Sequence, residues 1–512
     1  MAIIFIFLLI LVASVFTPQY ILFLLVLNLF AGLFLSLSQI IIALLPHAKP
    51  LHKQLNSQPF VSIFVPAYNE PPAILMQTLE TLSKLRYDNF EVLVIDNNTE
   101  DPDIWKPVEA FTKTLGEKFR FFHVDRLSGF KAGALNYLIK YMEKKSEYVA
   151  VIDADYLVHS YFLTTALSYF TNKDIALVQF PQQYRNRIKK NQAIADEYRH
   201  FFGIYMNMAN HLDCVPSTGT VSIYKSNVLR QIGGFRGEAL TEDADIGLRI
   251  YGAGYRGIFV DRPIGYGLMP YDLEAYRKQK WRWAFGNAQS IKTLFSLFGK
   301  IPFRSWLGFL IHLTAWDHLN FLPFAVLAAY SVVLLPNIPV TPTHRLLLEI
   351  ASLSIFVTLI SKLILIRVAL RNQPNSLSRS LRAFGVHIGM TFLYSEAWLT
   401  YILRMKFTFE RTNKFIFAKM PSLLKNSYKE LVLGLWFLIG MVEAIFWGTR
   451  IITVVAYFVS SIILFSVYYV YWKIYPTKSY SKKIFENTEK KYLPYIKSTT
   501  HNVNYELTEA RL

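Results

Sequence analysis

The chain has 512 residues, of which 53% are hydrophobic and 18% charged, and its formal charge is +18. It is too apolar for an ordinary soluble enzyme and too charged in its middle for a simple bundle of membrane helices, which favours a soluble domain inserted between membrane segments. Its one cysteine, Cys214, excludes an internal disulfide and a cysteine-based zinc site. We assign the positive charge to basic loops on the cytoplasmic side of a membrane. No nucleic acid is expected as a partner.

Residues 1–46 predict a hairpin of two membrane helices. The runs 2–16 and 21–45 contain no Asp, Glu, Lys or Arg. The second run is long enough to span a bilayer, which takes about 20 residues. The first is short enough for a signal-peptide core, but it lacks a basic start and a cleavage site.

Residues 47–300 predict a cytoplasmic α/β domain, because short apolar strands alternate with helices there. The expected strands are 61–65, 91–95, 119–123 and 148–152, and the expected helices include 72–85 and 131–144. This alternation implies a mostly parallel sheet with helices on its faces. Ligands of such sheets bind beyond the carboxyl ends of the strands, where Asp96, Asp153 and Asp155 lie.

Apolar runs return after residue 300. Spans are expected at 309–335, 348–370, 430–447 and 450–472. The stretch 383–403 is also apolar, but if it crossed the bilayer, the basic residues after it would face outside. We therefore place it along the cytoplasmic interface as an amphipathic helix. The expected organisation is two spans in 301–371, the interfacial helix and a loop in 372–429, two spans in 430–473, and a basic cytoplasmic tail in 474–512.

The segment from Tyr148 to Asp155 is an apolar run that ends in two carboxylates, Asp153 and Asp155. If the strand continues through Asp153, alternation places both carboxylates on one side. Such a pair suits a hard divalent cation that keeps waters and substrate phosphates as its other ligands. By itself the Asp-x-Asp pattern is common in loops.

Two further motifs suit a nucleotide. A strand ends on Asp96, followed by Asn97 and Asn98, and these acceptors suit a base edge, or else cap a helix. The segment Gly129 to Asn136 opens a helix with two glycines and Lys131, which suits a phosphate, although its spacing is not that of a P-loop.

Two motifs suit the transfer itself. Thr241-Glu242-Asp243 offers a general base, or else a helix start capped by Thr241. Gln279-Lys-Trp-Arg282-Trp283 offers a planar guanidinium for phosphate oxygens and a flat ring for a sugar. Alternatively, this second segment is an interfacial helix that uses Trp and Lys as membrane anchors.

Taken together, these motifs resemble those of the membrane-integrated family-2 glycosyltransferases, which include cellulose, hyaluronan, chitin and bacterial β-glucan synthases. The matching parts, in family order, are Asp96, Asp153 with Asp155, Thr241 to Asp243, and Gln279 to Trp283. The resemblance implies a GT-A-type, Rossmann-like domain between transmembrane helices, a nucleotide-sugar donor, and Mg²⁺ or Mn²⁺ as cofactor.

The resemblance also implies roles for single residues. Asp153 and Asp155 would hold the metal, and Asp243 would be the catalytic base, with Glu242 the next candidate. The residues implied to bind the nucleotide sugar are Asp96, Lys131, Asp153 and Arg282, and those implied to bind the acceptor are Gly219, Gln279 and Trp283.

A second resemblance lies in Phe409 to Lys414, which is similar to the gating loop of cellulose synthases, with Arg411 in place of the usual Val. It implies that Thr412 and Lys414 contact the bound nucleotide. The alternative is a basic linker held to anionic lipid headgroups by its positive charges.

We therefore expect a processive inverting β-glycosyltransferase that uses a UDP-sugar, foremost UDP-glucose, to make and translocate a β-glucan-type polysaccharide. The alternatives are a single-addition enzyme acting on a lipid acceptor, similar to glucosylceramide synthase, and a non-enzymatic transporter. Expected partners are the donor, the growing polysaccharide or a lipid acceptor, membrane lipids and accessory export subunits. The expected location is a bacterial inner (plasma) membrane. Asp317, His318, Asn320 and Glu443 are expected to line a polar path through the spans.

Overall fold

The computed structural model describes most of the chain. The described residues are 2–46, 48–187, 189, 191–270, 273–316, 326, 340–405, 423–474 and 478–499. The gating-loop-like segment, with Thr412 and Lys414, lies outside the described residues. So does most of the expected span 309–335, including Asp317, His318 and Asn320.

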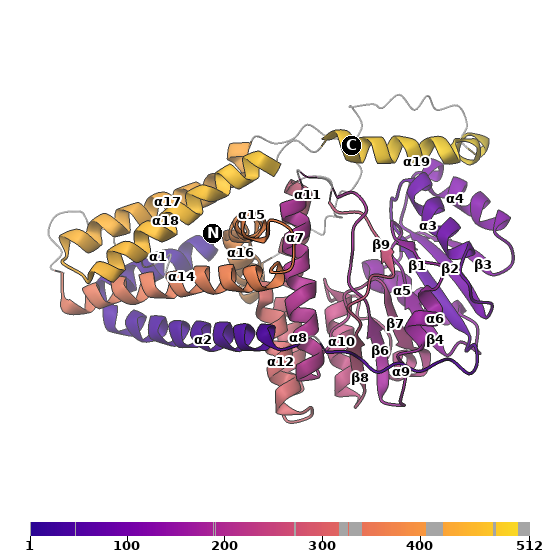
Figure 1. The fold of residues 1–512 in the computed structure, drawn as a ribbon, viewed down its shortest axis with the longest axis horizontal. Coiled ribbons are helices and arrows are strands. Elements are labelled where there is room, and N and C mark those ends of the chain that lie inside the picture. The colour runs from indigo at the N-terminus through magenta and orange to yellow at the C-terminus, as the bar shows by residue number, and fades with distance from the viewer. Residues whose placement is uncertain are drawn as a thin grey trace.

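A seven-stranded mixed sheet forms the centre of the domain at one end of the molecule (Figure 1). Its order is β3-β2-β1-β4-β7-β6-β8, and β7 runs antiparallel to both of its neighbours, whereas the other pairs are parallel. The strands are β1 Val61–Ala67, β2 Phe90–Asn97, β3 Phe119–Val124, β4 Tyr148–Val151, β6 Ile175–Gln179, β7 Ser222–Lys225 and β8 Arg256–Phe259. A separate ribbon pairs β5 Leu157–Val158 with β9 Gly265–Tyr266.

The four strands expected from the sequence are all present, and each of their ends lies within two residues of the expected position. β1 continues through Pro66 to Ala67, where it still pairs with β2. β4 ends at Val151, so Asp153 and Asp155 lie in the turn after the strand, and strand alternation is the wrong reason for placing them together. The carboxyl ends of β1, β2, β3 and β4 still meet at one edge, because these strands are parallel.

Helices cover both faces of this sheet, which explains why β1 and β2 are buried along their whole lengths. Ile63 and Val94 face the side covered by α3 Pro72–Ser83 and α4 Pro102–Thr114. Phe64 and Leu93 face the side covered by α5 Phe130–Tyr141 and α10 Glu242–Gly252. The remaining helices of the domain are α6 Phe162–Leu167, α7 Gln192–His200, α8 Asn207–Leu212, α9 Ser226–Gln231 and α11 Leu273–Ser296. A π-helical turn, Phe201–Met206, joins α7 to α8.

Long apolar helices gather at the other end of the molecule (Figure 1). They are α1 Ala2–Phe16, α2 Pro18–Leu44, α14 Pro342–Ala369, α17 Leu423–Phe446 and α18 Ile451–Ile474. Within the described residues, α2, α14 and most of α18 are long and apolar enough to cross a membrane. α17 is not among these three, and it carries Glu443, whose fully buried carboxylate has no hydrogen-bond partner in the described part of the chain.

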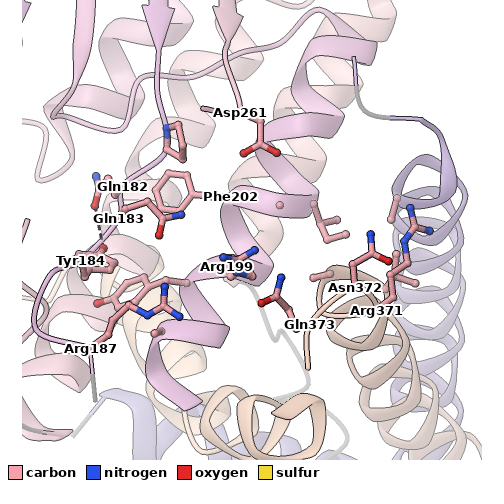
Figure 2. A pocket seen from close by; sticks show the side chains of 18 residues that line it. Gln182, Gln183, Tyr184, Arg187, Arg199, Phe202, Asp261, Arg371, Asn372 and Gln373 are labelled. Atoms are coloured by element: carbon pink, nitrogen blue, oxygen red, sulfur yellow. Dashed lines mark hydrogen bonds between the residues drawn. The ribbon is translucent and has the colours of Figure 1, made fainter. Parts of the chain in front are cut away.

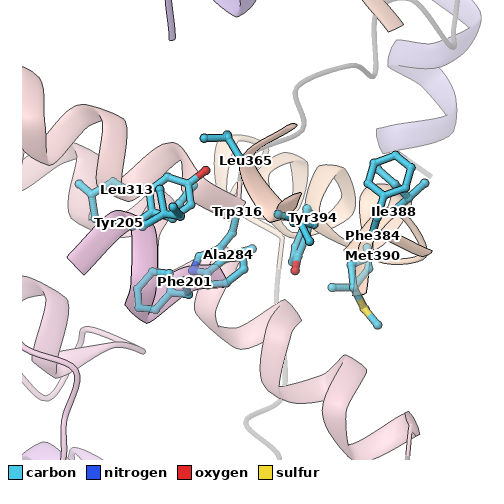
Figure 3. Close-up of a cluster of buried hydrophobic side chains, with 14 of the residues drawn as sticks. Phe201, Tyr205, Ala284, Leu313, Trp316, Leu365, Phe384, Ile388, Met390 and Tyr394 are labelled. Carbon is cyan, nitrogen blue, oxygen red and sulfur yellow. The ribbon is translucent and has the colours of Figure 1, made fainter. Parts of the chain in front are cut away.

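The stretch expected to lie along the interface as one helix forms two helices, α15 Ser376–Ile388 and α16 Thr391–Ile402. The chain breaks at Gly389, where a Cβ atom would lie only 2.1 Å from the Tyr471 hydroxyl of α18. Buried side chains of α15 and α16 join a large apolar cluster with α11 and α14 (Figure 3). The segment therefore forms two helices instead of one and packs between the domain and the long helices, and its place along the membrane interface stays a prediction.

The tail expected at 474–512 contains a helix, α19 Lys478–Thr499, that lies against α3 and α4 (Figure 1). Tyr492 donates a hydrogen bond to Glu80, and the rings of Tyr492 and Tyr495 meet Phe111 edge-on at 5.7 and 5.0 Å. This contact places α19 on the same side of any membrane as the sheet domain.

Candidate active site

Most of the predicted site residues line one cavity of about 130 Å³ near the carboxyl end of β4. We call it the catalytic cavity. Its lining includes Lys131, Asp153, Asp155, Gly219, Glu242, Asp243, Gln279, Arg282 and Trp283. These residues are spread over more than 150 positions of the chain, and the fold brings them together from α5, the turn after β4, the segment before β7, α10 and α11.

Lys131 lies at the centre of the polar contacts. Its ammonium is 2.6 Å from Asp153 Oδ1, 2.7 Å from the carbonyl oxygen of Gly219 and 3.9 Å from Glu242 Oε1. Burial alone would lower the pKa of Lys131, but the carboxylates of Asp153 and Glu242 outweigh burial and raise this pKa above its ordinary value. Lys131 is therefore a fixed positive charge at the start of α5, whose preceding residue Gly129 has a φ of +85°.

The two carboxylates after β4 are held differently. The backbone N–H of Asp153 donates to Thr220 Oγ1 at 3.0 Å, and its side chain faces Lys131. Asp155 is only 3% exposed, and its Oδ2 accepts the backbone N–H of Leu268 at 2.7 Å. Both carboxylates line the same cavity, so the donor set fits a hard cation such as Mg²⁺ or Mn²⁺ whose remaining ligands are phosphate oxygens and water.

Asp243 stands in the first turn of α10 with an altered acidity. Burial and the neighbouring Glu242 carboxylate raise the pKa of Asp243 to about 7, although Lys131 opposes this effect. A carboxylate with a pKa near neutrality suits a general base. Thr241 occupies the N-cap position but makes no capping hydrogen bond, so the alternative role of Thr241 as a side-chain cap is wrong.

Helix α11 contributes Gln279, Arg282 and Trp283 to the lining of the catalytic cavity. Gln279 accepts a hydrogen bond from the Tyr198 hydroxyl. Burial lowers the pKa of Arg282, while Glu242, Asp243 and Asp153 raise it, which places this guanidinium among the carboxylates of the site. Trp283 is half-buried and meets the Tyr198 ring edge-on, with the two ring centres 5.8 Å apart.

A buried charge network behind α11 was missed by the sequence reasoning. Lys280 and Glu197 are both fully buried and form an ion pair at 2.7 Å, and His387 of α15 lies 3.1 Å from the other carboxylate oxygen. The Lys280 ammonium also sits 3.6 Å from the centre of the Trp316 ring. Lys280 is therefore no membrane anchor, which corrects the alternative reading of this segment. No periodicity of charge in the sequence marks the pair.

The same network contains a compact set of side chains of the types that bind metal ions. Atoms of Glu197, His200 and His387 lie within 4.8 Å of one another. Lys280 already neutralises the one carboxylate of this set. We therefore interpret the cluster as a structural ion pair that fixes α11 against α7 and α15.

Asp96 lies apart from the catalytic cavity as the described residues define it. It is 2% exposed, accepts a hydrogen bond from Thr99 Oγ1 at 2.9 Å and lies 3.2 Å from His123 Nδ1. Burial raises the pKa of Asp96. His123 in turn stacks on Trp105 of α4 at 4.0 Å. These two rings, which the sequence reasoning did not single out, flank the carboxyl edge of β2.

The sheet order, the antiparallel β7 and the carboxylates beyond β4 define a GT-A-type glycosyltransferase fold. Residues 58–286 match the family described as Glycosyltransferase like family 2, so the chain carries a family-2 glycosyltransferase domain.

Comparison with known proteins agrees with this assignment. The chain is 26% identical over 251 residues to a cellulose synthase catalytic subunit [UDP-forming] of Xanthomonas axonopodis pv. citri, a match that covers 47% of this chain and 33% of that protein. It is 29% identical over 267 residues to the corresponding subunit of Komagataeibacter sucrofermentans, covering 50% and 34%. The chain thus spans about a third of the length of these curated relatives.

One solved structure shares the fold over most of the chain. It is the mannosyltransferase PcManGT from Pyrobaculum calidifontis in complex with GDP-Man and Mn²⁺. The two align with a TM-score of 0.53 at 18% identity, over 76% of this chain and all of the other.

Proposed function

We propose that the protein is a processive inverting β-glycosyltransferase that takes a sugar from a UDP-sugar, foremost UDP-glucose, and adds it to a growing β-glucan-type polysaccharide that it also translocates. The observation that carries this proposal is the catalytic cavity, where a base with a raised pKa, a half-buried lysine and arginine, a carboxylate pair and a tryptophan meet. The cellulose synthase relatives support the UDP-sugar and the polymer.

Each residue of the cavity has a task in this reaction. The donor diphosphate would lie against Lys131 and Arg282, whose positive charges stabilise the negative charge that builds on the leaving group. When bound, a divalent cation held by Asp153 and Asp155 supplies further neutralisation of the diphosphate. The acceptor sugar would stack on Trp283, with its hydroxyl directed at Asp243.

The chemical step would transfer the sugar from the diphosphate of the donor to the hydroxyl of the acceptor. Asp243 removes the proton of the acceptor hydroxyl, and the freed oxygen bonds to C1 of the donor sugar. The bond from C1 to the diphosphate oxygen breaks, and its electron pair leaves with UDP. Attack on the face opposite to the leaving group converts an α-linked donor into a β-linked product. The Gly219 carbonyl accepts a hydrogen bond from Lys131 and so helps to hold this lysine beside Asp153.

The test is transfer from radiolabelled UDP-glucose by the purified full-length protein, with products separated by length. Long β-glucan that is absent with Asp243→Asn supports the proposal. Products extended by a single sugar on a lipid would replace processive synthesis by the single-addition reaction. An absence of transfer from every UDP-sugar offered, in a preparation that is folded, would overturn the assignment.

A further inference from the structure

A second cavity, of about 160 Å³, lies where the domain meets the long helices (Figure 2). Its lining includes Arg187, Arg199 and Arg371, and we call it the arginine cavity. It shares two lining residues, Gln182 and Tyr184, with the catalytic cavity. The Tyr184 hydroxyl donates to Gln182 Oε1 at 3.1 Å, so these two side chains form a common wall.

The charge of the arginine cavity is positive. Three arginines and one carboxylate, Asp261, line it, which leaves a net charge of +2. Asp261 accepts a hydrogen bond from Asn207 at 3.3 Å, so its carboxylate already has a partner other than the arginines. Figure 2 shows Arg199 extending into the space between Arg187 and Gln373.

Arg199 lacks the partners that a half-buried guanidinium normally has. It makes no hydrogen bond or ion pair with any residue in the described part of the chain. Burial lowers the pKa of Arg199, and the positive charges of Arg187 and Arg379 lower it further, while Asp196 and Asp261 act in the opposite direction. Arg187 and Arg199 therefore repel one another across the cavity, and an anion between them would relieve this repulsion.

The position of the arginine cavity indicates where that anion comes from. Ala43 at the end of α2, and Val368 and Ala369 at the end of α14, form its far wall. Both helices are long and apolar enough to cross a membrane, and both end here. Arginines just beyond the ends of such helices lie at the level of the lipid headgroups.

We propose that the arginine cavity binds the phosphate group of an anionic membrane lipid. Arg187 and Arg199 would each donate paired hydrogen bonds to the phosphate oxygens, a geometry that guanidinium groups favour. The amides of Asn372 and Gln373 line the same cavity and would face the polar part of the headgroup. The acyl chains would run along α2 and α14. Through Gln182 and Tyr184, the bound headgroup would support one wall of the catalytic cavity.

The experiment measures lipid retention by native mass spectrometry of the full-length protein in detergent, with phosphatidylglycerol and phosphatidylcholine offered in equal amounts. The test variant is Arg187→Ala/Arg199→Ala. The matched control is Arg304→Ala/Arg382→Ala, which removes the same charge from two arginines outside the cavity. Arg304 faces Asp213 at 3.6 Å, and Arg382 bonds only to its own helix at 3.3 Å among the contacts described for it.

We expect the wild type and the control to retain phosphatidylglycerol in preference to phosphatidylcholine, and the test variant to lose at least about tenfold in this retention, because charged hydrogen bonds are removed. If the double variant is unstable, the single variant Arg187→Ala, at a half-exposed position, replaces it, and we expect a smaller loss of phosphatidylglycerol retention. Equal retention of both lipids by the wild type, or unchanged retention by the test variant, would overturn the proposal. Full displacement of the lipid by inorganic phosphate would overturn the lipid as the source of the anion.

Discussion

The Cα of Gly219 lies so close to the Asp243 carboxylate that a Cβ atom at this glycine would stand 2.7 Å from Asp243 Oδ2. Gly219 also has a φ of +80°, which side chains rarely adopt, and its carbonyl holds Lys131. One small residue thus sets the position of both the base and the lysine of the proposed reaction.

Gly219→Ala is therefore expected to reduce transfer strongly, by about 10²-fold, because a displaced catalytic group loses its alignment. The matched control is Gly233→Ala. Gly233 has a similar φ of +75°, and a Cβ atom there would meet nothing within 4 Å. Both variants carry the same backbone strain, about 1–3 kcal/mol. Equal activities of the two variants in a transfer assay would contradict the role given to Gly219.

Asp243→Asn is expected to leave UDP binding nearly intact and to lower turnover by at least about 10²–10⁴-fold, the usual effect of removing a general base. Glu242→Gln should retain most of the activity. Isothermal titration with UDP, alongside the transfer assay, separates binding from turnover. If Glu242→Gln is the inactive variant and Asp243→Asn is active, the base is Glu242.

The raised pKa of Asp243 gives a pH dependence. The base acts only when it is deprotonated, so kcat/KM should fall about tenfold per pH unit below about pH 7 and level off above it. Glu242→Gln removes the like charge that helps to raise this pKa, so the acid limb should move to lower pH. If kcat/KM falls over the same pH range in Glu242→Gln as in the wild type, a group other than Asp243 titrates.

The carboxylate pair is expected to control metal-dependent binding. Asp153→Ala and Asp155→Ala should each weaken UDP binding in the presence of Mg²⁺ or Mn²⁺, and a chelator should weaken binding to the wild type to a similar extent. Glu109→Ala, which removes a carboxylate on α4 that pairs with Lys113 at 2.9 Å outside the catalytic cavity, is the control. If both variants bind UDP as tightly as the wild type and with the same metal dependence, Asp153 and Asp155 do not hold the metal.

The buried ion pair makes a prediction about stability. Glu197→Gln leaves the Lys280 ammonium buried without its counter-charge, which typically costs about 3–5 kcal/mol. Glu274→Gln, on the same helix as Lys280, breaks only an exposed pair with Lys278 and should cost less than about 1 kcal/mol. Thermal unfolding of the two variants in the same detergent measures the difference. Similar midpoints would mean that Lys280 is neutral or solvated.

The local features of the site could be predicted from the sequence, because each depends on a short pattern. The apolar run before Asp153, the glycines around Lys131 and the acids after Thr241 were all sufficient to place their residues at the ends of strands or the starts of helices. Their meeting in one cavity followed from the resemblance to known enzymes, since no local pattern specifies which strand ends are neighbours.

Long-range contacts account for what the sequence did not predict. The pairing of Glu197 with Lys280 joins helices 83 positions apart, and nothing in either helix alone marks its partner. At the break between α15 and α16, Gly389 approaches the Tyr471 hydroxyl of a later helix so closely that a Cβ atom would not fit, and the amphipathic pattern of 383–403 does not reveal this contact. The contact of α19 with α3 likewise depends on Glu80, more than 400 residues away.

The position of α19 also bears on how the protein is made. A ribosome reaches this helix only after it has synthesised α2, α14, α17 and α18, yet the surface on which α19 rests belongs to α3 and α4, which emerge early. Glu80 and Phe111 therefore stay uncovered by α19 until these long helices have been synthesised. Closing this surface is therefore a late step of assembly, and it joins α19 to the first part of the sheet domain.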